Sequence, residues 1–235
     1  MDVRPRVDIV LPCYNPTGDW IEKIAENFDR ITNSFKCDFF VYVVNDGSSR
    51  GYDEVSLAKL KQLVPSSEAV IYYPNMGKGF ALREGISRCN SQFIIYTDCD
   101  FPYTLNSFGN VLDALLNGAD VVVATRDCSY VKRLPPFRKI LSIGSHLVNI
   151  VLLNHRIKDT QGGLKGMNEK GKNVFLSTKI NGFLFDSEFI LKASKVKGLK
   201  IKKVQSKIRE DIHLSNMGSK VLKQELINLF KILFR

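Results

Sequence analysis

The chain has 235 residues, of which 44% are hydrophobic and 25% charged, and its formal net charge is +10 at pH 7. This length suits a single α/β domain with a substantial core, and the hydrophobic content is ordinary for a soluble protein. The positive charge favours anionic partners, but the basic residues are spread out and form no nucleic-acid-binding motif, so nucleic acid is not an expected partner. Five cysteines, at positions 13, 37, 89, 99 and 128, lack metal-finger spacing and fit reduced thiols in the cytoplasm, and the N-terminus has no apolar signal core.

Strand-like and helical patterns alternate through the first half of the chain. Strands are predicted at residues 7–12, 39–45, 69–73, 93–97 and 121–125. Helices are predicted between them at residues 20–35, 52–63, 79–88 and 105–117. This alternation predicts a mostly parallel α/β sheet, whose ligands bind in the crevice at the carboxyl ends of the strands.

Polar side chains follow each of the first four predicted strands. Tyr14 follows the first strand, Asp46 the second, Lys78 the third, and Asp98 with Asp100 the fourth. Because the carboxyl ends of parallel strands meet at one edge of the sheet, these side chains are expected to share a crevice.

Asp98 and Asp100 form the most informative pair. They are separated by one residue at the end of an apolar run, so they can share one face if the strand continues through them. Mg²⁺ and Mn²⁺ are commonly held by one or two carboxylates plus substrate phosphates. The pair predicts a divalent metal that bridges a diphosphate, with Asp100 as a direct ligand and Asp98 acting directly or through water. A turn or helix cap is the alternative explanation.

Four segments, 10–15, 44–49, 75–79 and 97–100, resemble in order and spacing the motifs of glycosyltransferases with the nucleotide-diphospho-sugar transferase (GT-A) fold. Segments 124–126, 159–165, 185–188 and 218–220, with Arg138 and Ser142, resemble the branch that uses a polyprenyl phosphate acceptor, as dolichyl-phosphate mannose and glucose synthases do. The similarity covers about residues 6–222. It implies a single GT-A domain over residues 1–235, with a mostly parallel sheet flanked by helices and a C-terminal amphipathic helix. A further polar side chain often follows the carboxylate pair in these synthases, whereas Pro102 stands nearby here.

The resemblance assigns the nucleotide to the first strand ends. Asp46 would accept a hydrogen bond from the N3 proton of a uracil or guanine-like base, and the Tyr14 ring would stack on a ligand. Pro12 would stiffen the loop that carries Asn15. Lys78, which stands between two glycines, can approach a phosphate closely. A simple turn and a solvated surface lysine are the ordinary alternatives for Asp46 and Lys78.

The residues expected to bind the sugar and the diphosphate of the donor lie further along the chain. Gln161 and Gly162 stand where the family places the donor sugar. Arg209 and Lys220 resemble cations that close over the donor diphosphate, although exposed basic residues are the commonest alternative.

Arg126, Arg138 and Ser142 are implied to hold the acceptor phosphate. Arg138 and Ser142 lie four residues apart in a predicted helix, so they share a face. A guanidinium group binds phosphate oxygens in a bidentate way, which suits both arginines to this task. A structural salt bridge or a solvated charge would explain either arginine singly.

Two apolar segments with basic flanks, residues 133–156 and 219–235, are candidate membrane-surface or acceptor-binding helices. The first is too short and too interrupted by polar residues to span a bilayer. A buried core helix explains it equally well, and docking on a partner helix explains the second. Many members of the resembled branch continue into transmembrane helices, whereas this chain stops at residue 235, so peripheral attachment is expected.

The sequence therefore predicts a metal-dependent glycosyltransferase, peripheral on the cytoplasmic membrane face, that moves a sugar from a nucleotide donor to a polyprenyl phosphate with inversion. UDP-glucose is slightly preferred to GDP-mannose as the donor, because segment 159–163 is closer to the glucose synthases. Asp186 is assigned a positioning role, because a phosphate acceptor is already ionised near neutral pH. The alternative enzyme transfers to a sugar hydroxyl, with Asp186 or Glu188 as the base; a nucleotidyltransferase and a silent nucleotide-sugar-binding or scaffold protein also stay open.

Overall fold

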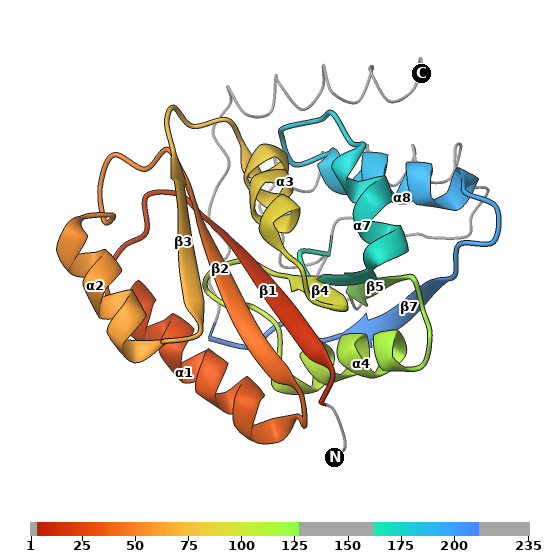
Figure 1. The fold of residues 1–235 in the computed structure, drawn as a ribbon, viewed down its shortest axis with the longest axis horizontal. Coiled ribbons are helices and arrows are strands. Elements are labelled where there is room, and N and C mark those ends of the chain that lie inside the picture. Colours follow the sequence, from red (N-terminus) through yellow and green to blue (C-terminus); the bar gives the residue numbers. More distant parts are fainter. Residues whose placement is uncertain (1–3, 127–161, 212–235) are drawn as a thin grey trace.

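The computed structural model describes residues 4–126 and 162–211. Within them, a twisted sheet of seven strands in the order β3-β2-β1-β4-β6-β5-β7 lies between two layers of helices (Figure 1). The strands are β1 (Arg6–Cys13), β2 (Asp38–Asp46), β3 (Ser67–Tyr72), β4 (Phe93–Tyr96), β5 (Val121–Arg126), β6 (Lys165–Asn168) and β7 (Ile201–Ser206). The helices are α1 (Trp20–Ser34), α2 (Glu54–Leu63), α3 (Lys78–Arg88), α4 (Leu105–Leu116), α7 (Glu169–Leu176) and α8 (Phe185–Lys195).

The sheet is mostly parallel. Strand β1 pairs in parallel with β2 and β4, and β5 pairs in parallel with β7. Strand β6 runs antiparallel between β4 and β5. The carboxyl ends of β1, β2 and β4 consequently meet at one edge, where the predicted donor residues follow them.

Both faces of the sheet are covered, which explains why the first strands read as continuous apolar runs. On one face, α1 and α4 pack on one set of buried strand side chains, and on the other face α3, α7 and α8 pack on a second set (Figure 1). Helix α1 buries an apolar stripe at three- and four-residue spacing, made by Ile21, Ile24, Phe28 and Ile31. On the other face, Phe175 contacts the rings of Tyr96, Phe185 and Phe189.

Side chains form N-terminal capping hydrogen bonds at the starts of several of these helices. Asp53 accepts a hydrogen bond from the Ser56 amide at the start of α2, and Thr104 caps α4 through the Ser107 amide. Asn168 caps α7 in the same way. Such caps satisfy amide groups that have no partner inside the helix, and they fix where each helix begins.

The predicted mostly parallel α/β fold is confirmed, and the five strands and four helices expected in the first half end within two residues of their observed bounds. Strands β6 and β7 and helix α7 were not predicted. Residues 133–156 lie wholly outside the described residues, as do residues 219–235. Along 4–126 and 162–211, the helices are too short or too polar to cross a membrane.

Candidate functional site

Asp98 and Asp100 lie just beyond the carboxyl end of β4. The Thr97 amide donates to the Val10 carbonyl at 3.3 Å, which continues the contact with β1 by one residue. The chain then turns, and the Phe101 amide donates to the Asp98 carbonyl at 3.0 Å. The pair therefore reaches the expected sheet edge, but it stands on a turn, because the strand ends at Tyr96. Alternation along a strand is not what brings the two carboxylates together.

Lys78, the first residue of α3, forms an ion pair with Asp98 at this edge. Burial lowers the pKa of Lys78, but the negative charges of Asp98, Asp186 and Asp100 outweigh burial and raise its pKa overall. Burial, and next the charge of Asp98, raises the pKa of Asp100. Asp100 nevertheless keeps an exposed surface, while Lys78 and Asp98 are half-buried. Added positive charge at this edge would relieve the repulsion between the two carboxylates.

Gly162 and Gly163 lie just before β6, and Gly163 packs against this site. The Gly163 amide donates to the Tyr103 hydroxyl at 2.7 Å. A Cβ atom on Gly163 would lie 2.8 Å from Asp98 Oδ2 and 3.7 Å from Lys78 Nζ, so the backbone here packs directly on the ion pair. A Cβ atom on Gly162 would lie 2.3 Å from the Ala124 carbonyl oxygen. At Gly162 a methyl group would meet backbone, so this position needs glycine, whereas at Gly163 it would meet the ends of the Asp98 and Lys78 side chains.

The loop after β1 is tied to the loop after β2. The Asn15 amide donates to Ser48 Oγ at 2.8 Å, and the Ser49 amide donates to Asn15 Oδ1 at 2.9 Å. Asn15 has a φ of 46°, a conformation that asparagine tolerates better than most residues. Pro12 lies within β1, and the Tyr14 side chain is 56% exposed, so its ring is open to a ligand.

Asp46 ends β2 and is buried. Its carboxylate accepts hydrogen bonds from the Tyr72 hydroxyl at 2.7 Å and from the Met76 amide at 2.8 Å. The Gly77 amide and the Asn75 side chain also donate to it. The carboxylate thus holds the loop that leads into α3 and Lys78. Base recognition by Asp46 stays a prediction.

Asp186 and Glu188 lie in the first turn of α8, and both side chains are buried. Asp186 Oδ1 lies 2.8 Å from Lys165 Nζ and accepts a hydrogen bond of 2.5 Å from the Tyr96 hydroxyl. Burial raises the pKa of Asp186, and the positive charges of Lys165 and Lys78 oppose that effect. Glu188 Oε2 accepts from the amides of Lys179 and Ile180, both at 2.8 Å. Glu188 therefore anchors the loop before α8.

Arg209 lies beneath the turn that carries the carboxylate pair. Its amide donates to the Pro102 carbonyl at 2.9 Å, and its guanidinium forms an ion pair with Asp211 and a 3.4 Å contact with Asn27 Oδ1. The hydrogen bond to Asp211 is the largest cause of a raised pKa of Arg209, and the charges of Asp211, Glu26 and lastly Asp100 add to it. The residue lines a cavity of about 250 Å³ between α1 and the start of α4.

The predicted acceptor residues cannot be placed beside this site. Arg126 ends β5, but its side chain is not described. Arg138 and Ser142 lie outside the described residues, as do Gln161 and Lys220, which were predicted to bind the donor.

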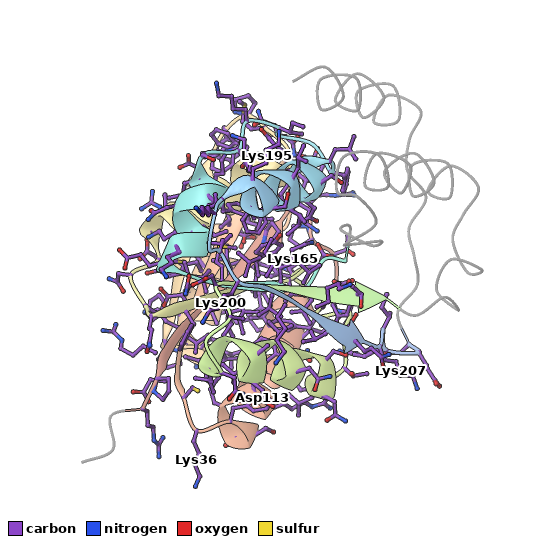
Figure 2. All side chains as sticks on the ribbon, turned by 90° about the vertical axis from the view of Figure 1, so that its right-hand side faces the viewer. Lys36, Asp113, Lys165, Lys195, Lys200 and Lys207 are labelled. Atoms are coloured by element: carbon purple, nitrogen blue, oxygen red, sulfur yellow. The ribbon has the colours of Figure 1, made fainter. Side chains whose placement is uncertain are left out.

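Three side chains that sequence reasoning did not single out support the site, namely Tyr96, Tyr103 and Lys165. Tyr96 and Lys165 contact Asp186, and Tyr103 holds Gly163. Lys165 stands within the motif segment 159–165, which was the only signal that could have pointed to it. Figure 2 labels it near the middle of the molecule.

The acidic residues at the edge suit a divalent cation. Neither at this edge nor elsewhere in 4–126 and 162–211 do His, Cys, Asp and Glu side chains gather in groups of three that could hold a metal ion on their own. Asp98 and Asp100 supply two carboxylates, which is the usual protein share where substrate phosphates and water complete the shell of Mg²⁺.

Two curated relatives match most of this chain. A dolichyl-phosphate β-glucosyltransferase from Trichomonas vaginalis is 27% identical over 206 residues, which cover 83% of this chain and 63% of the relative. A dolichol-phosphate mannosyltransferase from Pyrococcus furiosus is 24% identical over 196 residues, which cover 80% of this chain and 53% of the relative. The chain thus spans less than two thirds of the length of these relatives.

Solved structures share the fold. Glucosyl-3-phosphoglycerate synthase from Mycobacterium tuberculosis, in complex with Mn²⁺, UDP and glucosyl-3-phosphoglycerate, aligns with a TM-score of 0.66 at 14% identity, over 98% of this chain and 79% of the synthase. Mannosyl-3-phosphoglycerate synthase from Rubrobacter xylanophilus aligns with a TM-score of 0.71 at 17% identity, over 97% of this chain and 74% of the synthase. The fold is the GT-A fold that the sequence predicted.

A protein-family model matches the part of the chain that carries the sheet edge. The model of glycosyl transferase family 2 matches residues 8–175, a stretch that contains all four motif segments of the sheet edge. Because this match covers well over half of the 235 residues, the chain belongs to glycosyl transferase family 2.

Proposed function

We propose that this chain transfers a sugar from a nucleoside diphosphate donor to a polyprenyl phosphate, in a single displacement that inverts the anomeric centre. An oxygen of the acceptor phosphate would attack the anomeric carbon while the bond to the nucleoside diphosphate breaks. An α-linked donor would then give a β-linked lipid product.

The observation that carries the proposal is the cluster of Lys78, Asp98 and Asp100 beneath the Gly162–Gly163 turn. Nearby carboxylates hold the pKa of Lys78 above its ordinary value, and its ammonium stands at the start of a helix, where it can neutralise phosphate oxygens. Asp98 and Asp100 would hold Mg²⁺ or Mn²⁺, which would supply positive charge to the departing diphosphate.

The hydrogen-bond and ion-pair partners of the two buried acids of α8 also agree with a phosphate acceptor. Asp186 is paired with Lys165, and Glu188 accepts two backbone amides. A sugar hydroxyl would need one of them as a base, whereas a phosphate is already ionised near neutral pH. This favours a phosphate acceptor over the alternative of a sugar hydroxyl.

The relatives guide the choice of substrates. The Trichomonas protein is named for glucose and dolichyl phosphate, and the Pyrococcus protein for mannose. We infer a UDP-glucose-like donor first and a GDP-mannose-like donor second. Because a polyprenyl phosphate resides in a membrane, we further infer that the protein works at the cytoplasmic surface of one, with Arg126, Arg138 and Ser142 at the acceptor phosphate.

The test is direct. The purified chain is incubated with Mg²⁺ or Mn²⁺, a panel of UDP- and GDP-sugars and a polyprenyl phosphate, and the lipid fraction is analysed by mass spectrometry. A polyprenyl-phosphate monosaccharide is expected that disappears with EDTA and with Asp100→Ala. Asp113→Ala is the matched control, because Asp113 is an exposed aspartate on α4, away from the sheet edge (Figure 2).

The product separates the alternatives. Sugar on a carbohydrate hydroxyl would refute the lipid phosphate acceptor. Metal-dependent nucleotide binding without transfer from any donor would favour a silent nucleotide-sugar-binding protein. Arg138→Ala should abolish the lipid product while leaving nucleotide binding intact, and loss of both would contradict its assignment to the acceptor.

A further inference from the structure

Lys165 is a lysine with no exposed surface. Its ammonium lies 2.8 Å from Asp186 Oδ1, donates to the Gly162 carbonyl at 2.5 Å, and lies 5.6 Å from the centre of the Tyr96 ring. The Tyr96 hydroxyl donates to the same Asp186 oxygen. Strands β4 and β6 and helix α8 thus each contribute one side chain to a buried network, which we call the Lys165 network (Lys165, Asp186 and Tyr96).

Stability alone explains this arrangement poorly. A buried ion pair loses the hydration of both charges, and a pair of well-packed apolar side chains is often as stable or more stable. The surroundings here are apolar and aromatic, with Phe175 and Phe185 packed on the Tyr96 ring. An apolar pair would fill this space, but it could not hold a backbone carbonyl.

The network lies directly behind the candidate donor site. Tyr96 stands two residues before Asp98 on the same strand end, and the charge of Asp186 reaches Lys78. The carbonyl that Lys165 holds belongs to Gly162, and the next residue, Gly163, packs on the Lys78–Asp98 ion pair. A shift of this turn would therefore move the groups proposed to hold the metal and the diphosphate.

We infer that Lys165 is a positioning residue for the donor. It holds the Gly162 carbonyl and so fixes the Gly162–Gly163 turn against Asp98 and Lys78, while Asp186 pairs with its ammonium. This inference rests on the proposed donor site, but it does not require any particular acceptor.

Three variants separate positioning from simple stabilisation. Lys165→Met keeps the length of the side chain but removes the hydrogen bond to Gly162 and leaves the Asp186 carboxylate without its cation. Asp186→Asn removes the carboxylate but keeps the lysine that holds Gly162. The double variant Lys165→Met/Asp186→Asn removes both charges. Asp8→Asn is the matched control, because Asp8 is another buried carboxylate that accepts from Asn90 and Ser91 at the opposite end of the sheet.

Two measurements are made on the full chain. Thermal unfolding reports stability, and calorimetry with Mn²⁺ and either UDP or GDP reports binding without turnover. The melting temperature should fall by roughly 10 °C in Lys165→Met and recover in the double variant, because an unpaired buried charge is costly and a neutral pair is not. Nucleotide affinity should fall about 10- to 100-fold in both Lys165→Met and the double variant, as it does when outer-shell partners of a metal site are lost. Asp186→Asn should lose less affinity than Lys165→Met, because Lys165 can still donate to the Gly162 carbonyl, and Asp8→Asn should keep affinity within about threefold.

Hydrogen exchange checks the turn itself. The Gly163 amide, which is bonded to Tyr103, should exchange faster in both variants that lack Lys165 and not in Asp186→Asn. Affinity that recovers together with the melting temperature in the double variant would overturn the inference, as would an equal loss of affinity in Asp186→Asn. If the wild-type chain binds the nucleotide but glycosylates no polyprenyl phosphate, the proposed acceptor fails and the role of Lys165 stands.

Discussion

The contact between Gly163 and the Lys78–Asp98 ion pair gives the sharpest test of the candidate site. In Gly163→Ala the new methyl carbon would lie 2.8 Å from Asp98 Oδ2, whereas ordinary contact begins at 3.4 Å. The carboxylate must retreat by the difference, about 0.6 Å, or the turn must move by as much. Catalytic groups must be held within about 0.5 Å of their productive positions, and a misplacement of about 1 Å can lower the reaction rate about 100-fold.

We therefore expect Gly163→Ala to lower kcat/KM by roughly 10- to 100-fold, which is about 1.4 to 2.7 kcal/mol of transition-state stabilisation. The stability of the fold should change little, because the methyl group meets only the ends of two side chains, of which Asp98 is 40% exposed. The assay is steady-state transfer with the donor and Mn²⁺ each varied, alongside thermal unfolding.

Gly166→Ala is the matched control from the neighbouring strand. Its methyl carbon would lie 2.7 Å from Leu115 Cδ1 and from Val111 Cγ1, in the core beneath α4. Overpacking of this kind costs about 1 to 3 kcal/mol of stability, but it should spare the kinetics of the folded molecules. The reasoning is refuted if Gly163→Ala keeps wild-type kinetics, or if its loss of activity merely follows a loss of stability as large as that of Gly166→Ala.

Three further substitutions test separate parts of the structure. Hydrogen bonds, chiefly from the Lys200 amide and also from the Asn168 side chain, hold the pKa of Asp120 below its ordinary value. The ionised Asp120 carboxylate therefore stabilises the fold at pH values above its unfolded-state pKa of about 3.9, and this stabilisation is lost as pH falls through the lower folded-state pKa. Asp120→Asn should accordingly be less stable than wild type at pH 7, with the difference in unfolding free energy shrinking below about pH 4; a gap independent of pH would contradict this assignment. Glu188→Ala should cost about 2 kcal/mol of stability by leaving one buried and one partly buried amide unpaired, and a turnover rate lowered by about 100-fold or more at an unchanged melting temperature would instead identify Glu188 as a base. Asp46→Asn should loosen the loop before α3 and weaken nucleotide binding together with stability, and calorimetry that finds binding lost with stability unchanged would point to direct base recognition instead.

The sequence predicted the first half of the fold because those strands are buried on both faces. Val7 to Leu11 and Val41 to Val44 read as strands with no knowledge of their neighbours. Strand β6 has the sequence Lys-Gly-Met-Asn, which carries no strand pattern, and it exists because β4 and β5 flank it. Among the strands of the described residues, β7 pairs with β5 alone, and it carries two exposed lysines, so its apolar signal is weak.

The candidate site was predictable where it depends on sheet topology. Asp98, Asp46 and Lys78 follow successive strands, and the parallel order alone brings them to one edge. The partners of these residues were not predictable, because they come from segments that approach only in three dimensions. No local pattern indicates that Lys165 is buried or that its ammonium meets Asp186, because that pairing depends on how α8 packs against β4 and β6.

The partners of the three acids at and behind the site bear on which acceptor the enzyme uses. Asp98 is paired with Lys78 at the surface of the site, Asp186 with Lys165 behind it, and Glu188 with backbone amides further away. Each of these three acids thus already serves a cation or an amide, and a hydroxyl acceptor would have to compete with that partner for a base. A phosphate acceptor brings its own negative charge and needs cations, which the proposal assigns to Arg126 and Arg138. The partners of the acids therefore support a phosphate acceptor, and the assignment of the two arginines stays a proposal.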